Sequence, residues 1–209
     1  MLPLTVEQEA AVIEKIKNGD VNAYEELVRA YEKNVYNLAL RMTGNSEDAS
    51  DMSQEAFIKA YNSLSGFRGD SKFSVWLYRI VSNVCLDFLR GKKRRSAVSL
   101  SVENDDGEEV QLDLADEALS PQVLLERSLT RDAVKRGLDA LPAEHREILL
   151  LREIQGLSYE EIGQALGLEE GTVKSRIFRA RKKLCAFLTA DGNIPDFAAS
   201  SYQRGGESQ

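Results

Sequence analysis

Basic side chains gather at two places in this sequence. Lys92–Arg95 is a run of four, and six more lie between Lys174 and Lys183. Closely spaced lysines and arginines neutralise phosphate groups, and an arginine can also donate two hydrogen bonds to the edge of a guanine. The chemistry that these residues favour is therefore the binding of nucleic acid.

The net charge of the chain is −7, but this charge is unevenly distributed. Eight acidic and no basic residues lie in the segment 96–120, whereas the segments 1–95 and 121–190 are close to neutral. Salt screens exposed charges that are more than about 10 Å apart. A distant acidic segment therefore does not prevent a basic cluster from binding phosphate.

The second basic cluster lies in a sequence that is typical of a helix-turn-helix. Ser158-Tyr159-Glu160-Glu161 is a capping box that opens a short helix, Gly167 ends it, and Gly171-Thr172 leads into a second helix. At 100° per residue one side of that second helix is apolar, and it carries Val173, Ile177, Ala180, Leu184 and Leu188. The candidate contacts with DNA lie on or beside the opposite side: Thr172, Lys174, Ser175, Phe178, Arg179 and Lys182.

A phenylalanine among cations is poorly suited to a water-exposed surface but fits a major groove. There Phe178 can contact thymine methyl groups, while Arg179 can bind a guanine edge. The alternative interpretation is a solvated basic helix face of the kind that many helical proteins have. The capping box, the turn and the phenylalanine together favour DNA binding.

A second candidate surface lies in the first half of the chain. The polar turn 67–72 precedes a helix predicted from Phe73 to Arg90, on which Trp76, Arg79 and Asn83 recur at steps of three and four residues. Together with the turn and with Lys92–Arg95, this flank suggests a surface that stacks on unpaired bases and reads them. The alternative is that Trp76 belongs to the core.

Helical periodicity dominates the whole sequence, and no hairpin signal occurs, so the predicted fold class is all-α. Residues 1–95 are predicted to form an N-terminal helical bundle, with helices over 6–17, 20–44, 46–65 and 73–90. Residues 121–190 are predicted to form a four-helix domain with the helix-turn-helix, its helices spanning 121–140, 142–155, 158–166 and 171–189. Residues 96–120 are expected to be an acidic flexible linker, and residues 191–209 a disordered tail.

Other classes of protein are poorly supported. No stretch has the length and apolarity of a membrane span, and the first ten residues do not have the composition of a signal peptide. Cys85 and Cys185 lack metal-ligand spacing, so reduced, packed thiols in a cytoplasmic protein are expected. The single histidine, His145, has no nucleophile indicated nearby. We therefore expect no catalytic residue, no cofactor and no metal site.

Four stretches of the sequence resemble the extracytoplasmic-function (ECF) sigma factors of the sigma-70 superfamily. These stretches are Asp48–Phe57, Phe67–Phe73, Trp76–Ile80 and Gly156–Arg181. They occur in the family's order and spacing, and the resemblance extends over roughly residues 8–188. It implies a protein that binds core RNA polymerase, directs it to promoter DNA, assists promoter melting and catalyses nothing itself.

The resemblance also implies roles for individual residues. Contact with core RNA polymerase is implied for Asp51, Gln54 and Glu55. The resemblance implies that one base of the −10 element is flipped out of the DNA and captured. The residues implied to bind this element are Phe67, Arg68, Asp70, Lys72, Trp76, Arg79 and Asn83. The −35 element is implied to be read by the helix-turn-helix residues Thr172, Lys174, Ser175, Phe178, Arg179 and Lys182.

The family further implies an anti-sigma factor as a partner, often a membrane-bound one. In the family the linker threads through the polymerase towards the RNA exit path, where an acidic strand can mimic nucleic acid. A plain flexible tether is the alternative role for segment 96–120.

A free-standing helix-turn-helix regulator, with the first bundle as a sensor, is the alternative function. Such a regulator binds duplex DNA without a polymerase. The turn 67–72 with Trp76, Arg79 and Asn83 argues against it, because a sensor bundle does not need a surface for unpaired bases.

Overall fold

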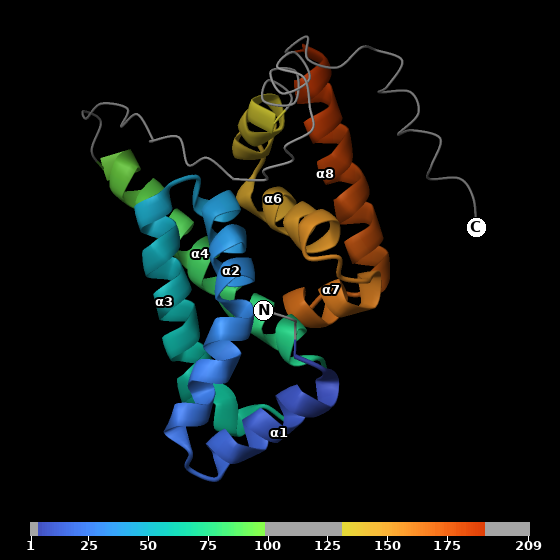
Figure 1. The fold of residues 1–209 in the computed structure, drawn as a ribbon. Coiled ribbons are helices and arrows are strands. Elements are labelled where there is room, and N and C mark those ends of the chain that lie inside the picture. Colours follow the sequence, from blue (N-terminus) through green and yellow to red (C-terminus); the bar gives the residue numbers. More distant parts are fainter. Residues whose placement is uncertain (1–3, 99–130, 191–209) are drawn as a thin grey trace, which may run out of the picture.

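The computed structural model describes residues 4–98 and 131–190, and all of the regular structure in these residues is helical (Figure 1). This confirms the predicted all-α fold with two helical domains. The elements of the first half are α1 Val6–Lys17, η1 Val21–Ala23, α2 Tyr24–Thr43, α3 Ser46–Ser63, η2 Leu64–Gly66 and α4 Phe73–Val98. None of the described helices combines the length and the apolar character that a membrane span requires.

The hairpin of α2 and α3 follows from local sequence. Helix α2 ends at Gly44, which has a φ of 77° in the left-handed region. The side chain of Asn45 then accepts hydrogen bonds from the amides of Glu47 and Asp48, which caps the start of α3. The two helices consequently lie side by side, with α4 packed against both (Figure 1).

Helix α4 is longer than the sequence predicted. The prediction ended it at Arg90, whereas the helix continues through Gly91 to Val98. The residues after Gly91 are mostly lysine, arginine and alanine, which favour a helix strongly enough to outweigh one glycine. The basic run Lys92–Arg95 is therefore helical, and residues 96–98 of the predicted linker continue the helix. The rest of that linker, the predicted helix start at Pro121 and the predicted tail lie outside the described residues.

The second half begins with a helix over residues 131–139, the described part of the predicted helix 121–140. It continues with α6 Ala143–Leu149, a π-helical turn η3 Leu150–Ile154, α7 Tyr159–Leu166 and α8 Glu170–Ala190. Both cysteines are free, Cys85 buried in α4 and Cys185 half-buried in α8.

The two halves pack against each other through α6 and α7, and Arg146 of α6 joins them. Its side chain is only 8% exposed, and its guanidinium donates hydrogen bonds to three backbone carbonyls. These are Met42 (2.7 Å) in the last turn of α2, and Leu138 (2.9 Å) and Asp139 (2.7 Å) at the end of the helix 131–139. Carbonyls in the last turn of a helix lack intrahelical partners, so one buried arginine satisfies the ends of two helices.

The neighbouring Glu147 is also buried where α6 meets α4, and it is 3% exposed. Burial raises the pKa of its carboxyl group to about 7, although Ser82 and the guanidinium groups of Arg176 and Arg90 act to lower it. A carboxyl group with a raised pKa retains its proton in the folded protein at a pH where the unfolded chain has lost it.

We therefore predict that Glu147 makes the fold less stable as the pH rises from about 4.5 to about 7. Over that range the unfolded chain loses the proton of Glu147 freely. In the folded protein, ionisation of the buried carboxyl group costs free energy, so the unfolded state is favoured increasingly. Relative to the native chain, Glu147→Gln should gain up to about 3 kcal/mol of unfolding free energy at pH 8 and almost nothing at pH 4.5. Urea unfolding at several pH values measures this difference. Glu32→Gln, an exposed change of the same charge on α2, is the control, and a gain of equal size at both pH values would contradict the prediction.

Candidate nucleic-acid interface

The helix-turn-helix forms as the sequence predicted. Ser158 Oγ accepts a hydrogen bond from the amide of Glu161 (3.1 Å), and the Glu161 carboxylate accepts one from the amide of Ser158 (2.8 Å). Helix α7 ends at Gly167, whose φ is 66°. The turn also needs glycine at position 163, because a Cβ there would lie 2.7 Å from the carbonyl oxygen of Leu168. The close packing at Gly163 holds the start of α8 against α7.

Helix α8 presents the predicted reading face to solvent. Val173, Ile177, Ala180 and Leu188 are buried as expected, and Leu184 is half-buried. The predicted DNA contacts are exposed, except for the half-buried Ser175: Thr172, Lys174, Phe178, Arg179 and Lys182. The ring of Phe178 is 57% exposed, although water solvates an aromatic ring poorly.

The cations on this face differ in their local partners. Lys174 forms an ion pair with Glu170 (2.6 Å), which raises the pKa of Lys174, and its ammonium lies 5.7 Å from the centre of the Tyr159 ring. Arg179 and Lys182 form no ion pair with any described residue. The face therefore holds two unpaired cations beside an exposed aromatic ring.

The second candidate surface is built on an aromatic cluster at the base of the loop 67–72. The ring of Phe67 lies 5.8 Å from that of Phe73 and 5.2 Å from that of Trp76, and Tyr31 lies 5.5 Å from Phe73. Phe67 is only 7% exposed, so the structure places this predicted contact in the core and not on the surface. Trp76 is half-buried in the same cluster, so it belongs partly to the core as well as to the flank.

The other predicted residues of this surface are accessible. Arg68, Asp70 and Lys72 are exposed on the loop, and Arg79 and Asn83 are exposed on α4. The structure therefore exposes five of the seven predicted residues, and Trp76 is half-buried.

An ion pair joins the two candidate surfaces. The ammonium of Lys72, on the loop, lies 2.8 Å from the carboxylate of Glu161, in the capping box of α7. This contact raises the pKa of Lys72 and lowers that of Glu161. Sequence reasoning missed it, because no local pattern relates residues 72 and 161.

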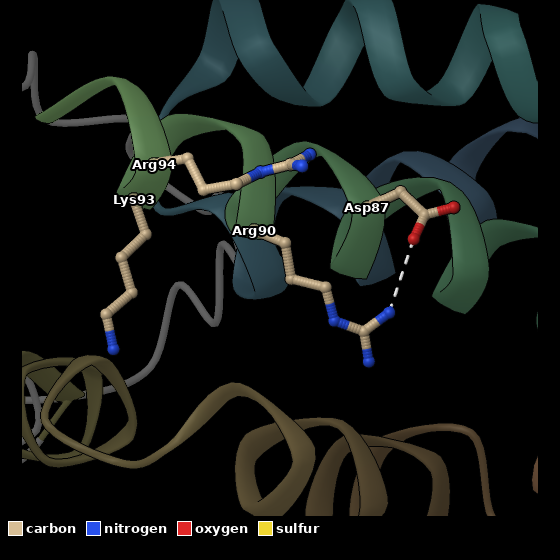
Figure 2. A pocket seen from close by; sticks show the side chains of 4 residues that line it. All are labelled: Asp87, Arg90, Lys93 and Arg94. Carbon is tan, nitrogen blue, oxygen red and sulfur yellow. Dashed lines mark hydrogen bonds and ion pairs between the residues drawn. The ribbon is translucent and has the colours of Figure 1, made fainter. Parts of the chain in front are cut away.

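The basic run Lys92–Arg95 divides between two environments. Lys92 forms an ion pair with Asp48 of α3 (3.1 Å), which ties the end of α4 to the bundle. Lys93 and Arg94 line a cleft together with Arg90 and Asp87, and Arg90 forms an ion pair with Asp87 (3.3 Å). Figure 2 shows the side chains of Arg90 and Lys93 extending from α4 towards the second half of the chain.

The residues expected to contact polymerase lie on the outer side of α3. Asp51, Gln54 and Glu55 are all exposed, whereas Met52 and Ser53 between them are buried. Ile58 continues the same stripe one turn later and is 61% exposed. Sequence reasoning passed over Ile58, although its position four residues after Gln54 and three after Glu55 places it on the same side of a helix.

Comparisons with known proteins agree with this geometry. Residues 27–95 match the family model of sigma-70 region 2, and residues 131–184 match that of sigma-70 region 4. The chain is 40% identical to the RNA polymerase sigma-H factor of Pseudomonas aeruginosa, over 87% of this chain and 94% of that protein. It is also 40% identical to the ECF RNA polymerase sigma-E factor of Escherichia coli K12, over 83% of this chain and 90% of the relative.

A solved structure has a similar fold. The structure of CnrH in complex with the cytosolic domain of CnrY matches with a TM-score of 0.62 and 27% identity, covering 87% of this chain and 97% of CnrH. The two region models, the two relatives and the helix-turn-helix agree on one assignment. This chain belongs to the ECF family of sigma-70 RNA polymerase sigma factors.

Proposed function

We propose that this chain is an alternative sigma factor that binds core RNA polymerase and directs initiation at specific promoters. The observation that carries the proposal is the exposed face of α8, where Phe178 and Arg179 project from a complete helix-turn-helix. The chain itself contributes no catalytic residue and no cofactor. Because it acts with the polymerase on the genome, its location is the cytoplasm.

Recognition of the −35 element belongs to α8. An α-helix fits into the major groove of duplex DNA, where Arg179 can donate two hydrogen bonds to a guanine and Phe178 can contact thymine methyl groups. Thr172, Lys174 and Lys182 lie around these two and bind the phosphates, and Ser175 contacts the groove from its half-buried position.

Recognition of the −10 element belongs to the loop 67–72 and to α4. Turning a base out of the stack costs a few kcal/mol, which contacts with the extruded base can offset. Arg68 and Asp70 on the loop and Asn83 on α4 are accessible for such contacts, with Arg79 and the edge of Trp76 beside them. Phe67 supports the loop from below, because its buried ring packs on Phe73 and Trp76.

Core polymerase is bound by the outer stripe of α3, formed by Asp51, Gln54, Glu55 and Ile58. A partner that covers this stripe removes the exposed side chain of Ile58 from water, which favours binding. An anti-sigma factor is a further partner in this proposal, and the acidic segment 96–120 serves either as a strand that mimics nucleic acid within the polymerase or as a tether.

Run-off transcription tests the function directly. Purified core polymerase is supplied with a pool of genomic fragments, with and without this protein. New transcripts whose templates share −35 and −10 elements support the sigma role and reveal the promoter. Binding to duplex DNA without any new transcript would favour the free-standing regulator instead.

We predict that Arg179→Ala weakens recognition of the −35 element by about 1–3 kcal/mol and leaves the −10 preference unchanged, because the bidentate contact with a guanine is lost. Competition between promoters that differ only in the −35 sequence measures the loss. Arg181→Ala is the matched control: it removes the same charge from α8, but Arg181 forms an ion pair with Glu153 (2.5 Å). An equal effect of the two variants would show that Arg179 contributes charge alone.

We also predict that Glu161→Gln strengthens binding of a single-stranded −10 oligonucleotide to the full chain by roughly two- to five-fold. Lys72 is a proposed contact of the −10 element, and its ion pair with Glu161 (2.8 Å) competes with the DNA for its ammonium. Glutamine retains the capping box and removes the ion pair. Fluorescence anisotropy measures the affinity. Glu160→Gln, an exposed neighbour with the same change of charge, should have no effect, and equal gains in both variants would contradict the prediction.

A further inference from the structure

Helix α1 contacts the start of the loop 67–72 through a lysine that the proposed function does not use. The ammonium of Lys17, the last residue of α1, donates a hydrogen bond of 2.6 Å to the backbone carbonyl of Phe67. Lys17 forms no ion pair with any described residue, and the carbonyl of Phe67 is the hydrogen-bond acceptor of its ammonium group. Hydrogen bonds with a charged donor are shorter and stronger than neutral ones.

The same helix also reaches the far end of the loop. Tyr31 of α2 donates a hydrogen bond to the carboxylate of Glu9 in α1, and the ring of Tyr31 packs edge-on against Phe73. Phe73 is the first residue of α4 and follows the loop directly. Helix α1 is thus linked to both ends of the loop, by Lys17 at Phe67 and by Glu9 through Tyr31 at Phe73.

Helix α1 is itself well anchored. Thr5 and Gln8 form a complete capping box at its start, and Val12 and Ile13 are buried in the core. A helix fixed at one end and buried along one side can hold a neighbouring loop in place.

Apart from these contacts and the ion pair of Lys72 with Glu161 (2.8 Å), the loop has few restraints. The side chains of Arg68 and Asp70 are exposed and form no hydrogen bond or ion pair with any described residue. Gly69 between them has a φ of 80°, in the left-handed region. The conformation of the loop therefore depends on what holds its two ends.

From these contacts we propose that Lys17 is a positioning residue for capture of the −10 element, holding the loop 67–72 in the shape that receives the extruded base. This inference rests on the proposed role of the loop in −10 recognition. Lys17 does not touch the DNA. It acts through the backbone at Phe67.

The first test does not depend on a promoter. In Lys17→Met the length of the side chain is kept and the donor is lost. Hydrogen exchange of the Phe67 amide, which donates to the carbonyl of Leu64 (3.0 Å), should therefore accelerate by roughly five-fold in the full chain. Lys17→Arg, which can still donate to the carbonyl, should restore slow exchange. Lys15→Met, an exposed change of equal charge on α1, should leave the loop unchanged. Equal exchange in all four proteins would overturn the proposal.

The second test uses holoenzyme and the promoter obtained by run-off transcription. Lys17→Met should reduce discrimination between the native and a scrambled −10 element by roughly five-fold, while −35 preference and core binding stay unchanged. Asn83→Ala separates two kinds of failure. If Asn83→Ala alters −10 preference and Lys17→Met does not, the role of Lys17 is wrong. If neither variant alters it, the assignment of the −10 element to this surface is wrong.

Discussion

The arrangement of the two halves depends on the buried guanidinium of Arg146. It donates to carbonyls of Met42, Leu138 and Asp139, which belong to the ends of two helices in different halves of the chain. An arginine suits this position because its planar group has five donors in a fixed geometry, whereas a lysine has one compact charge. Burial lowers the pKa of Arg146, and the carboxylate of Asp139 (3.4 Å away) counteracts this.

This junction determines where the two candidate DNA surfaces meet. Because α6 is anchored at the end of α2, the helix-turn-helix lies beside α4, with α7 close to the loop 67–72. There Glu161 stabilises its own helix by capping and also pairs with Lys72. The contact is exposed on the lysine side, so it contributes little energy and is easily exchanged for a phosphate. The reading face of α8 takes no part in it and remains open.

Local signals in the sequence predicted much of the fold and most of the α8 face. The capping box at Ser158, the end of α7 at Gly167 and the buried stripe from Val173 to Leu188 depend on residues within a few positions of one another. The position of Arg146 and the pair of Lys72 with Glu161 could not be predicted, since they join residues that only tertiary packing brings together. The extension of α4 past Arg90 was missed, although the lysines and arginines after Gly91 are good helix formers.

Phe67 and Phe178 show why the same residue type at two predicted contacts ended in different environments. Phe67 has aromatic neighbours within reach, so burying its ring against Phe73 and Trp76 removes apolar surface from water. Phe178 lies on the side of α8 that faces away from the buried Val173 and Ile177, and its side chain stays exposed. A phenylalanine that can pack into a neighbouring cluster of aromatic rings is therefore weak evidence for a binding surface. One that the fold leaves exposed among cations is stronger evidence, because packing alone does not account for it.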